Sequence, residues 1–472
     1  MSTEPATRAA RRRRAGGGFT RMLAIVIAGL VVAGAVGAAV SLAQGPRVSA
    51  VAVDAQAAAE AAGQRIVFTT NQPLAEIDPA QVSVEPAAAF TLEAAGRNIA
   101  VEFTYPLDPD TEYRVEITGV EGSSGGPTAT LAHAFTTGIP PLYVLQRRAD
   151  EDDVIFSSNL AGDEAVPVHT AAQIEDFRAS RDGIVVHTTD ADGAAALSVV
   201  TGEGDPAEFT MPGEGTITTL QAADHGGLVG YTYTDLDIGA GGGIEAALYL
   251  ARMDDPAAEP TRIEVGEDAR VVQWAFVPQT SALVVLTFDG QLRLVETRDL
   301  DAEPVLLGGA LALSGVERGT GRVIVERTEG TVVLDLTDLS EEPLVAAEGA
   351  EALGIPGPVT PTVEGATLRT FTQMGADGFP QSQLIASVAA DGAVTPLLEL
   401  TDRGDAVMQT CASPSGRYAA VIVAPDLAEN PYDLYTRPLP ERLETTIVDT
   451  ADAEVVTTLQ GTDISWCAVA MP

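Results

Sequence analysis

Two pairs of aspartates stand near glycine in a spacing that could hold a metal ion. Asp190 and Asp192 precede Gly193, and Asp235 and Asp237 lie just before a glycine-rich run at 239–243. Carboxylates two residues apart in a sharply turning loop are the hard oxygen ligands that calcium prefers. Neither pair completes an EF-hand pattern with its distant glutamate. Aspartate and glycine also form ordinary turns between strands, so the four aspartates are calcium candidates and turn formers alike.

A single pair of cysteines could form a covalent bond. Cys411 and Cys467 are the only two cysteines in the chain, and such a pair persists as a disulfide outside the reducing cytoplasm. The bond would close a loop of about 55 residues, which contributes roughly 4 kcal/mol in the chain-entropy model. Two buried free thiols are the alternative, and both interpretations give the cysteines a structural role.

No pattern typical of a catalytic or cofactor site accompanies these residues. The histidines are dispersed without the spacing of a zinc site; they are His133, His169, His187 and His225. The sequence contains no Gly-x-Ser-x-Gly nucleophile elbow, no phosphate-binding loop, and no dinucleotide or haem motif. We therefore predict no catalytic residue, no cofactor and no zinc site.

The first 45 residues predict a protein of the cell membrane. Arginines between residues 8 and 21 precede an uncharged apolar run from Met22 to Ala43. About 20 such residues form a helix as long as the hydrocarbon core is thick. Flanking arginines stay inside, so we expect a cytoplasmic tail (1–21), a transmembrane helix (22–43) and an extracytoplasmic remainder. A cleaved signal peptide is the alternative, because Ser41-Leu42-Ala43 resembles a small-x-small cleavage site.

The rest of the chain is strongly acidic. All but Glu4 of the 67 acidic residues follow residue 44, and the chain has only 27 basic residues and a formal net charge of −40. This charge argues against nucleic acid, whose binding requires basic contacts, and against docking on anionic lipid head groups. A solvated acidic surface, loose cation binding and attraction of a basic partner all fit.

Residues 46–138 predict a small β-sandwich. Short segments alternate between apolar and polar residues, as half-buried strands do, and proline and glycine turns separate them. The clearest segments are Ile66–Phe68, Val82–Val84, Phe90–Leu92, Ile99–Phe103 and Tyr113–Ile117. Six or seven strands in this length fit an immunoglobulin-like sandwich.

Three stretches of this region resemble a known class of module. VFTTNQPL, PLDPDTEYRVEITGV and the closing HAFTTG are similar to the bacterial Ig-like modules of S-layer and other surface proteins. The resemblance implies a spacer or an adhesion module. Members of that class usually carry an aspartate and a Gly-Asn after the "GV", and the loop 121–126 has neither.

Residues 141–472 predict a β-propeller. Short strands recur in groups of four at spacings of about 40–55 residues, the period of propeller blades. The stretch SPSGRYAAV resembles the Ser-Pro-Asp-Gly signature of WD40-like, TolB-type propeller repeats, which implies the fold but no activity. Seven blades are expected, with six and eight as alternatives, from innermost strands near Phe177, Leu220, Trp274, Leu313, Leu353, Cys411 and Trp466.

The two ends of this region suggest how the ring closes. Only three strands follow Leu142 before the next blade begins, and one strand is left over at 464–469. A C-terminal strand that completes the first blade would close the ring and remove exposed sheet edges. Cys411 and Cys467 then lie on innermost strands of neighbouring blades, so their bond would join the ring at its seam.

The sequence thus predicts a mainly β, membrane-anchored, non-catalytic protein whose Ig-like spacer presents a propeller to a protein or cell-envelope ligand. One alternative is a propeller ectoenzyme, a hydrolase or lyase, with acids and tyrosines such as Tyr231 and Tyr233 lining its funnel. The other is a sensor subunit of an envelope complex. Fold alone does not decide among them.

Overall fold

The computed structural model describes residues 19, 21–34, 45–148, 151–202, 204–224, 226–239, 242–461, 463–469 and 471. The chain divides into two compact units. Unit 1 comprises the chain up to Asp54 together with Arg65–Glu102 and Glu112–Thr136. Unit 2 comprises Ala55–Gln64, Phe103–Thr111 and Thr137–Pro472.

The expected localisation in the cell membrane is wrong. Across the described residues, no helix combines the length and the apolar character needed to span a bilayer. Residues 21–34 are helical. Most of the expected basic tail and residues 35–43 of the expected span lie outside the described residues.

Unit 1 contains two antiparallel sheets, one of four strands and one of three. The first has the order β1 (Val48–Ala52), β2 (Arg65–Thr70), β5 (Asn98–Phe103), β4 (Phe90–Ala95), and the second β3 (Val82–Glu85), β6 (Glu112–Val120), β7 (Ala129–Thr136). Every second residue is buried in β2, β5 and most of β6, which gives each of these strands one apolar face. The strand segments expected from the sequence are therefore confirmed.

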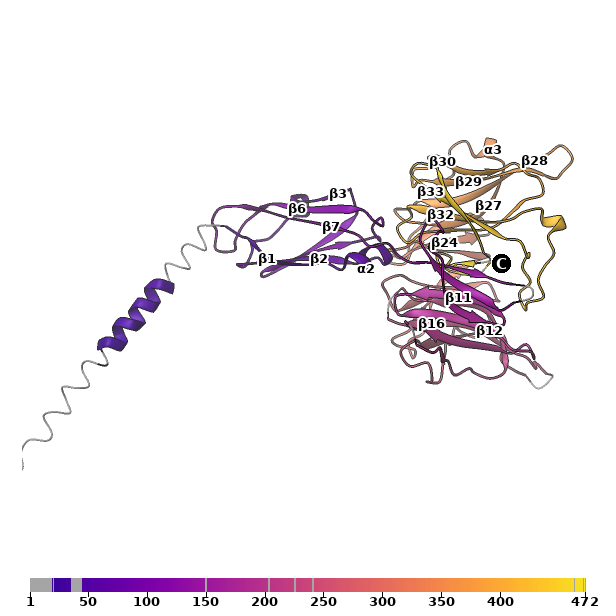
Figure 1. Cartoon of the computed structure of the whole chain (residues 1–472), viewed down its shortest axis with the longest axis horizontal. Coiled ribbons are helices and arrows are strands. Elements are labelled where there is room, and N and C mark those ends of the chain that lie inside the picture. The colour runs from indigo at the N-terminus through magenta and orange to yellow at the C-terminus, as the bar shows by residue number, and fades with distance from the viewer. Residues whose placement is uncertain are drawn as a thin grey trace, which may run out of the picture. The chain divides into compact units, whose positions relative to one another are not determined.

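Unit 2 contains seven four-stranded antiparallel sheets within the described residues (Figure 1). The first three, from the innermost strand outward, are β35 (Asp463–Ile464), β8 (Leu142–Gln146), β9 (Asp153–Ser158), β10 (Val166–Ala171); β11 (Ile174–Ser180), β12 (Gly183–Thr189), β13 (Ala195–Val200), β14 (Ala207–Glu208); and β15 (Gly215–Ala222), β16 (Leu228–Asp235), β17 (Ala247–Arg252), β18 (Thr261–Arg262).

The other four sheets follow the same order along the chain. They are β19 (Val271–Phe276), β20 (Ala282–Thr287), β21 (Gln291–Glu296), β22 (Val305–Gly309); β23 (Ala312–Val316), β24 (Arg322–Arg327), β25 (Gly330–Asp335), β26 (Glu341–Pro343); β27 (Ile355–Pro361), β28 (Thr367–Met374), β29 (Pro380–Val388), β30 (Val394–Leu400); and β31 (Ala406–Ala412), β32 (Tyr418–Ala424), β33 (Glu444–Asp449), β34 (Val455–Gln460). The short helical elements are α2 (Ala55–Glu60), η1 (Pro79–Gln81), α3 (Ala350–Leu353) and η2 (Leu427–Glu429).

These seven sheets are the blades of a β-propeller. Successive first strands from β11 to β31 contact one another, as blades arranged around an axis require. β35 pairs with β8 through Ile464 opposite Val144, so the end of the chain completes the first blade. The blade number and a closing strand at the C-terminal end are confirmed. The strand is shorter than the expected 464–469, because it spans only Asp463–Ile464, and Cys467 therefore lies beyond it rather than on an innermost strand.

The second strand of a blade is the most apolar, because neighbouring blades cover both of its faces. β20 and β32 read ALVVLT and YAAVIVA and are almost wholly buried, the pattern of a strand without a solvent face. Short polar turns such as Ser413–Arg417, between β31 and β32, lead into these strands.

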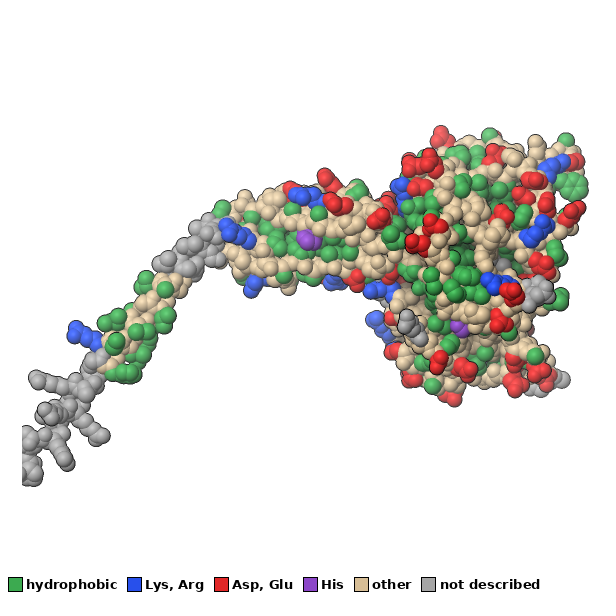
Figure 2. Space-filling view, in the orientation of Figure 1, with side chains coloured by type: hydrophobic (Ala, Val, Ile, Leu, Met, Phe, Trp, Pro, Cys, Tyr) green, Lys and Arg blue, Asp and Glu red, His purple; other side chains and the backbone are tan. Residues whose placement is uncertain are grey.

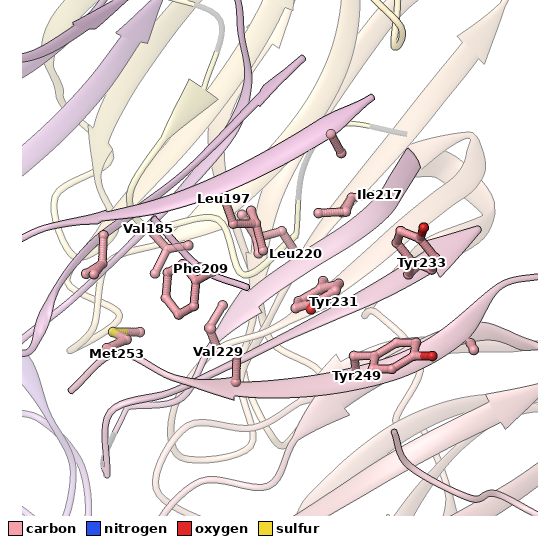
Figure 3. Close-up of a cluster of buried hydrophobic side chains, with 14 residues drawn as sticks. Val185, Leu197, Phe209, Ile217, Leu220, Val229, Tyr231, Tyr233, Tyr249 and Met253 are labelled. Atoms are coloured by element: carbon pink, nitrogen blue, oxygen red, sulfur yellow. The ribbon is translucent and has the colours of Figure 1, made fainter. Parts of the chain in front are cut away.

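Tyr231 and Tyr233 belong to the packing between blades and do not line a funnel. Both are fully buried in a cluster with Val185, Leu220 and other apolar side chains (Figure 3). Tyr249 stacks on Tyr231 at 6.0 Å between ring centroids and meets Tyr233 edge-on at 5.9 Å. Their proposed role in an enzyme funnel is wrong, because alternate residues of β16 face the neighbouring blade.

A disulfide joins the two ends of the ring, as predicted. Cys411 on β31 and Cys467, just beyond β35, are bonded with their Cα atoms 5.1 Å apart. Both sulfurs are buried in a cluster that includes Trp466, whose ring stacks on Tyr418 with centroids 6.2 Å apart. The bond therefore connects the last blade to the first within a packed apolar core.

Candidate binding face of the propeller

Two of the four aspartates suggested as calcium ligands, Asp190 and Asp235, accept backbone hydrogen bonds within their own loops. The Asp190 carboxylate accepts the backbone N–H groups of Asp192 at 2.9 Å and Ala194 at 2.8 Å. Asp235 accepts the N–H of Ile244 at 2.7 Å. These bonds give the backbone N–H groups of the two loops an acceptor. Calcium binding at these residues stays a prediction.

A different group of acids lies close together. Carboxylate oxygens of Asp402, Asp405 and Asp426 lie within 4.8 Å of one another. Asp402 and Asp405 follow β30, and Asp426 follows β32, so the topology brings them together from two blades. No sequence pattern predicts this grouping, because Asp426 lies 21 positions after Asp405 and 24 after Asp402.

The topology gives the propeller two distinct faces. In each antiparallel blade, the connection between the second and third strands emerges on the same side as the connection to the next blade. We call this side the upper face. The lower face carries the turns between the first and second and between the third and fourth strands.

Segments 55–64 and 103–111 of unit 2 contact the lower face. Tyr105 donates a hydrogen bond to Glu317 at 3.1 Å, and Arg181 pairs with Glu60 at 3.5 Å. Burial, with the nearby Glu317 carboxylate, raises the pKa of the Tyr105 phenol to about 12. The lower face is therefore partly covered by the chain itself.

The upper face carries one long connection, residues 425–443 between β32 and β33, which we call the clamped loop. It forms a small hairpin of its own, in which Asp433 N–H donates to the Leu439 carbonyl at 2.9 Å. The buried Asn430 side chain braces the base through Arg442, donating to its carbonyl at 2.8 Å and accepting its N–H at 3.0 Å. Hydrogen bonds within the loop itself therefore order it, in addition to its bonds to other blades.

The first blade holds the far end of the clamped loop. Arg147 pairs with Asp433 at 2.8 Å, and its guanidinium lies 4.2 Å from the centre of the Tyr435 ring. The Tyr435 hydroxyl bonds to both oxygens of the Asp153 carboxylate at 2.8 Å. Burial, followed by the hydrogen bond to Asp153, raises the pKa of this phenol, so it remains a donor. Arg147 is almost fully buried, where hydrogen-bonded ion pairs hold geometry strongly.

The second blade holds the same loop through one carboxylate. Glu175 on β11 accepts the N–H of Thr436 at 2.9 Å and the N–H of Arg437 at 3.2 Å. Burial alone would raise the pKa of Glu175, but these two donors and Arg147 outweigh it and lower that pKa. Glu175 is therefore an ionised acceptor that fixes the backbone of residues 436–437.

An ionic group ties the innermost strands together beneath the loop. Arg178 pairs with Asp176 at 2.9 Å and with Asp463 of β35 at 3.0 Å, and donates to the Leu220 carbonyl of β15 at 3.0 Å. Burial raises the pKa of Asp176 strongly, and the neighbouring Asp463 raises it further, although Arg178 opposes the shift. One arginine thus links three blades.

Two of the four histidines, His187 and His169, lie in positions where burial lowers the pKa. His187 of β12 is buried near Glu175, and burial lowers its pKa to about 4. Burial also lowers the pKa of His169. His133 lies on β7, and His225 lies outside the described residues. His187 is neutral at pH 7 and fills the interior.

Large apolar side chains are exposed on the upper face. Leu434, in the clamped loop, is 99% exposed although Asp433 and Tyr435 on either side of it are held. Phe379 between β28 and β29 is 67% exposed, and Tyr432, Phe288 and Leu311 are also exposed on connections of this face. In Figure 1 the yellow segment before β33 and the tip of the β28–β29 hairpin project from the same side of unit 2.

On the side of unit 2 seen in Figure 2, acidic side chains outnumber basic ones. Two small cavities among the described residues measure about 10 and 20 Å³, room for about one water. Turn residues of the lower face contribute to both, Gly365 to the first and Ser413 to the second.

Comparison with known proteins shows similarity of fold alone. No family model matches the chain, and no curated protein matches it. The β-propeller domain of Cps50 (Swd1) from Myceliophteria thermophila is 14% identical, covering 61% of this chain and 87% of that one, with a TM-score of 0.38. The tricorn protease is 10% identical over 88% of this chain and 44% of its own, with a TM-score of 0.41. The uncharacterized protein lmo1340 of Listeria monocytogenes EGD-e is 13% identical over 63% and 92%, with a TM-score of 0.42. The propeller assignment thus depends on the sheets of this chain.

Proposed function

We propose that the protein is a non-catalytic binding scaffold whose propeller, residues 141–472, binds a protein partner on its upper face. Residues 46–138 are proposed as an Ig-like spacer, a role supported by the two antiparallel sheets of unit 1 and the three resembling stretches. Propellers commonly bind partners through connections at one end. The lower face is partly occupied by segments 55–64 and 103–111, which leaves the upper face for a partner.

One observation carries this proposal: Leu434 is fully exposed on a loop that is rigidly held. Exposed apolar side chains on ordered loops act as anchors at interfaces, because little conformational entropy is lost when a partner covers them. Burial of one leucine side chain contributes about 2 kcal/mol, or roughly 30-fold in Kd. The loop that carries Leu434 is held on both sides of this residue. Arg147 pairs with Asp433, Asp153 bonds to Tyr435, and Glu175 bonds to the backbone of residues 436–437.

The proposal is tested by matched affinity columns of the full chain. Leu434→Ser removes the anchor, and Leu339→Ser is the control, because Leu339 is an exposed leucine of the lower face. We expect a partner that is retained by the wild type and by Leu339→Ser but lost with Leu434→Ser, and whose Kd for purified Leu434→Ser rises at least tenfold. Equal Kd values for the two variants would contradict the proposal. Turnover of a peptide, glycan or phosphoester by the purified chain would favour the ectoenzyme alternative.

The proposal for calcium is separate and has its own test. Calorimetric titration of the full chain with calcium, repeated on Asp190→Asn/Asp192→Asn and on Asp235→Asn/Asp237→Asn, is expected to show heat that one of these variants loses. Identical isotherms for all three proteins would remove these aspartates as ligands.

A further inference from the structure

We propose that the upper face of blades six and seven receives a basic polypeptide segment that carries large apolar side chains. This inference deepens the proposed function, because it names the chemical class of the partner. It begins from the apolar side chains: Phe379 on the β28–β29 connection and Tyr432 and Leu434 on the clamped loop are half to fully exposed. Exposed apolar groups on one face of a protein mark interaction sites.

Hydrogen bonds connect the two apolar positions through the chain between blades six and seven. Arg403 donates to the Pro380 carbonyl at 3.2 Å, next to Phe379, and Leu427 of the clamped loop donates its N–H to the Gly404 carbonyl at 2.7 Å. The connection 402–405 therefore bridges the β28–β29 connection and the base of the clamped loop. The two connections that carry the apolar side chains are thus held to the same bridging segment.

The charge of that bridging segment indicates whether the partner is basic or acidic. The carboxylates of Asp402, Asp405 and Asp426 lie within 4.8 Å of one another. Backbone N–H groups orient two of them: Gly404 donates to Asp402 at 3.0 Å, and Asp426 donates to Asp405 at 3.1 Å. Like charges held this close favour a cation from outside, and an arginine or lysine of a partner supplies one.

The nearby arginine does not neutralise this group. Arg403 makes a bidentate pair with Asp377, with distances of 2.8 and 2.7 Å from one Nη to the two carboxylate oxygens. In the described part of the chain, no arginine pairs with Asp402, Asp405 or Asp426. Among the described residues the three carboxylates of Asp402, Asp405 and Asp426 are therefore not paired with an arginine, although the clamped loop also carries the basic residues Arg437 and Arg442.

Other occupants fit this surface less well. A second copy of the chain would bring a formal net charge of −40 against the same charge, and like-charged surfaces repel. Nucleic acid and anionic lipid are repelled for the same reason. A basic segment with apolar side chains satisfies both features of the surface at once.

The test is selection of random 15-residue peptides displayed on phage against the immobilised full chain at 50 mM salt. We expect enriched peptides with net positive charge and large apolar residues. Their Kd should rise at least tenfold on Leu434→Ser/Phe379→Ser, and about tenfold on Asp402→Asn/Asp405→Asn/Asp426→Asn, since three exposed charge contacts together are of that size. The control Asp299→Asn/Asp301→Asn/Glu303→Gln removes the same charge from an exposed lower-face connection and should leave Kd unchanged.

The outcomes separate this inference from the proposed function. Peptides that depend on Leu434 but are neutral or acidic would overturn the basic partner and keep the upper face as a binding face. Peptides that bind the Leu434→Ser/Phe379→Ser variant as well as the wild type, or no enrichment at all, would contradict both. Concentration-dependent dimers that Leu434→Ser abolishes would identify a second copy as the occupant and would also overturn the inference.

Discussion

Removal of the disulfide at the seam of the ring should destabilise the propeller by about 4 kcal/mol. Cys411 and Cys467 are 56 residues apart in sequence, and in the chain-entropy model a loop of this length restricts the unfolded chain by roughly that free energy. β35 is only two residues long and pairs with β8 at two positions. The covalent bond is therefore a major restraint on the closing strand.

The assay is guanidinium unfolding of the wild type and of Cys411→Ala/Cys467→Ala, followed by tryptophan fluorescence. The chain has two tryptophans, and both Trp274 and Trp466 are buried in unit 2, so the signal reports on the propeller alone. The free energy of unfolding should fall by about 4 kcal/mol in the variant. Wild-type protein unfolded in the presence of a reductant should match the variant, since both lack the bond.

Two results would refute this reasoning. A difference below about 1 kcal/mol between variant and wild type would show that chain entropy at the seam contributes little. Alkylation of either cysteine in the unreduced native protein would show that the bond is not formed. A single Cys411→Ala variant should lose about as much stability as the double variant, because either change breaks the same bond.

Three further predictions concern the clamped loop, a buried histidine and the packing between blades. Glu175→Gln replaces one acceptor oxygen by a donor facing the N–H groups of residues 436–437, so we expect a loss of about 1–3 kcal/mol and faster proteolysis within 425–443; an unchanged cleavage rate would contradict the clamp. His187 has a lowered pKa of about 4, so below pH 6.5 the unfolded chain binds a proton that the folded chain does not, and stability falls as the pH falls. His187→Gln should reduce the stability lost between pH 7 and pH 5 by about 2 kcal/mol, whereas an equal loss in both proteins would exclude this group. A β-carbon on Gly230 would lie 2.4 Å from the Trp274 ring, so Gly230→Ala should destabilise the protein by about 1–3 kcal/mol. The control is Gly309→Ala, whose β-carbon would come no nearer than 3.7 Å to Gly290. Equal unfolding midpoints for the two variants would contradict this account of the packing.

The propeller could be predicted from sequence because its signals are local and repeated. Strand-turn-strand units such as those around Phe177 and Cys411 recur at the blade period, and the leftover strand near Ile464 implied closure. Leu353, taken as part of an innermost strand, lies instead in the helix that ends two residues before β27. The connection from β26 to β27 spans residues 344–354 and is long. It changes the spacing between comparable strands, so the first residue of β27 could not be located from the repeat.

The proposed binding face could not be predicted because it depends on contacts between distant residues. Arg147 and Asp433 are 286 positions apart, and Glu175 meets the backbone of residues 436–437 only after the ring has closed. Asp402, Asp405 and Asp426 come from two connections. A signal was nevertheless present: the segment between β32 and β33 is much longer than a hairpin turn, and long ordered connections are often functional.

The membrane helix failed for a different reason. Composition alone favoured a span from Met22 to Ala43, whereas across the described residues no helix is long and apolar enough to cross a bilayer.

Site-specific photocrosslinking at Leu434 tests the central claim most directly. The full chain would carry a benzophenone amino acid at position 434 or, as the control, at position 339 on the lower face, and would be irradiated in cells that produce it. The proposed binding face predicts one adduct of defined mass with a basic protein at position 434, absent at position 339 and lost when Asp402, Asp405 and Asp426 are changed to asparagine. Adducts at position 339 alone, or none at position 434, would contradict the account.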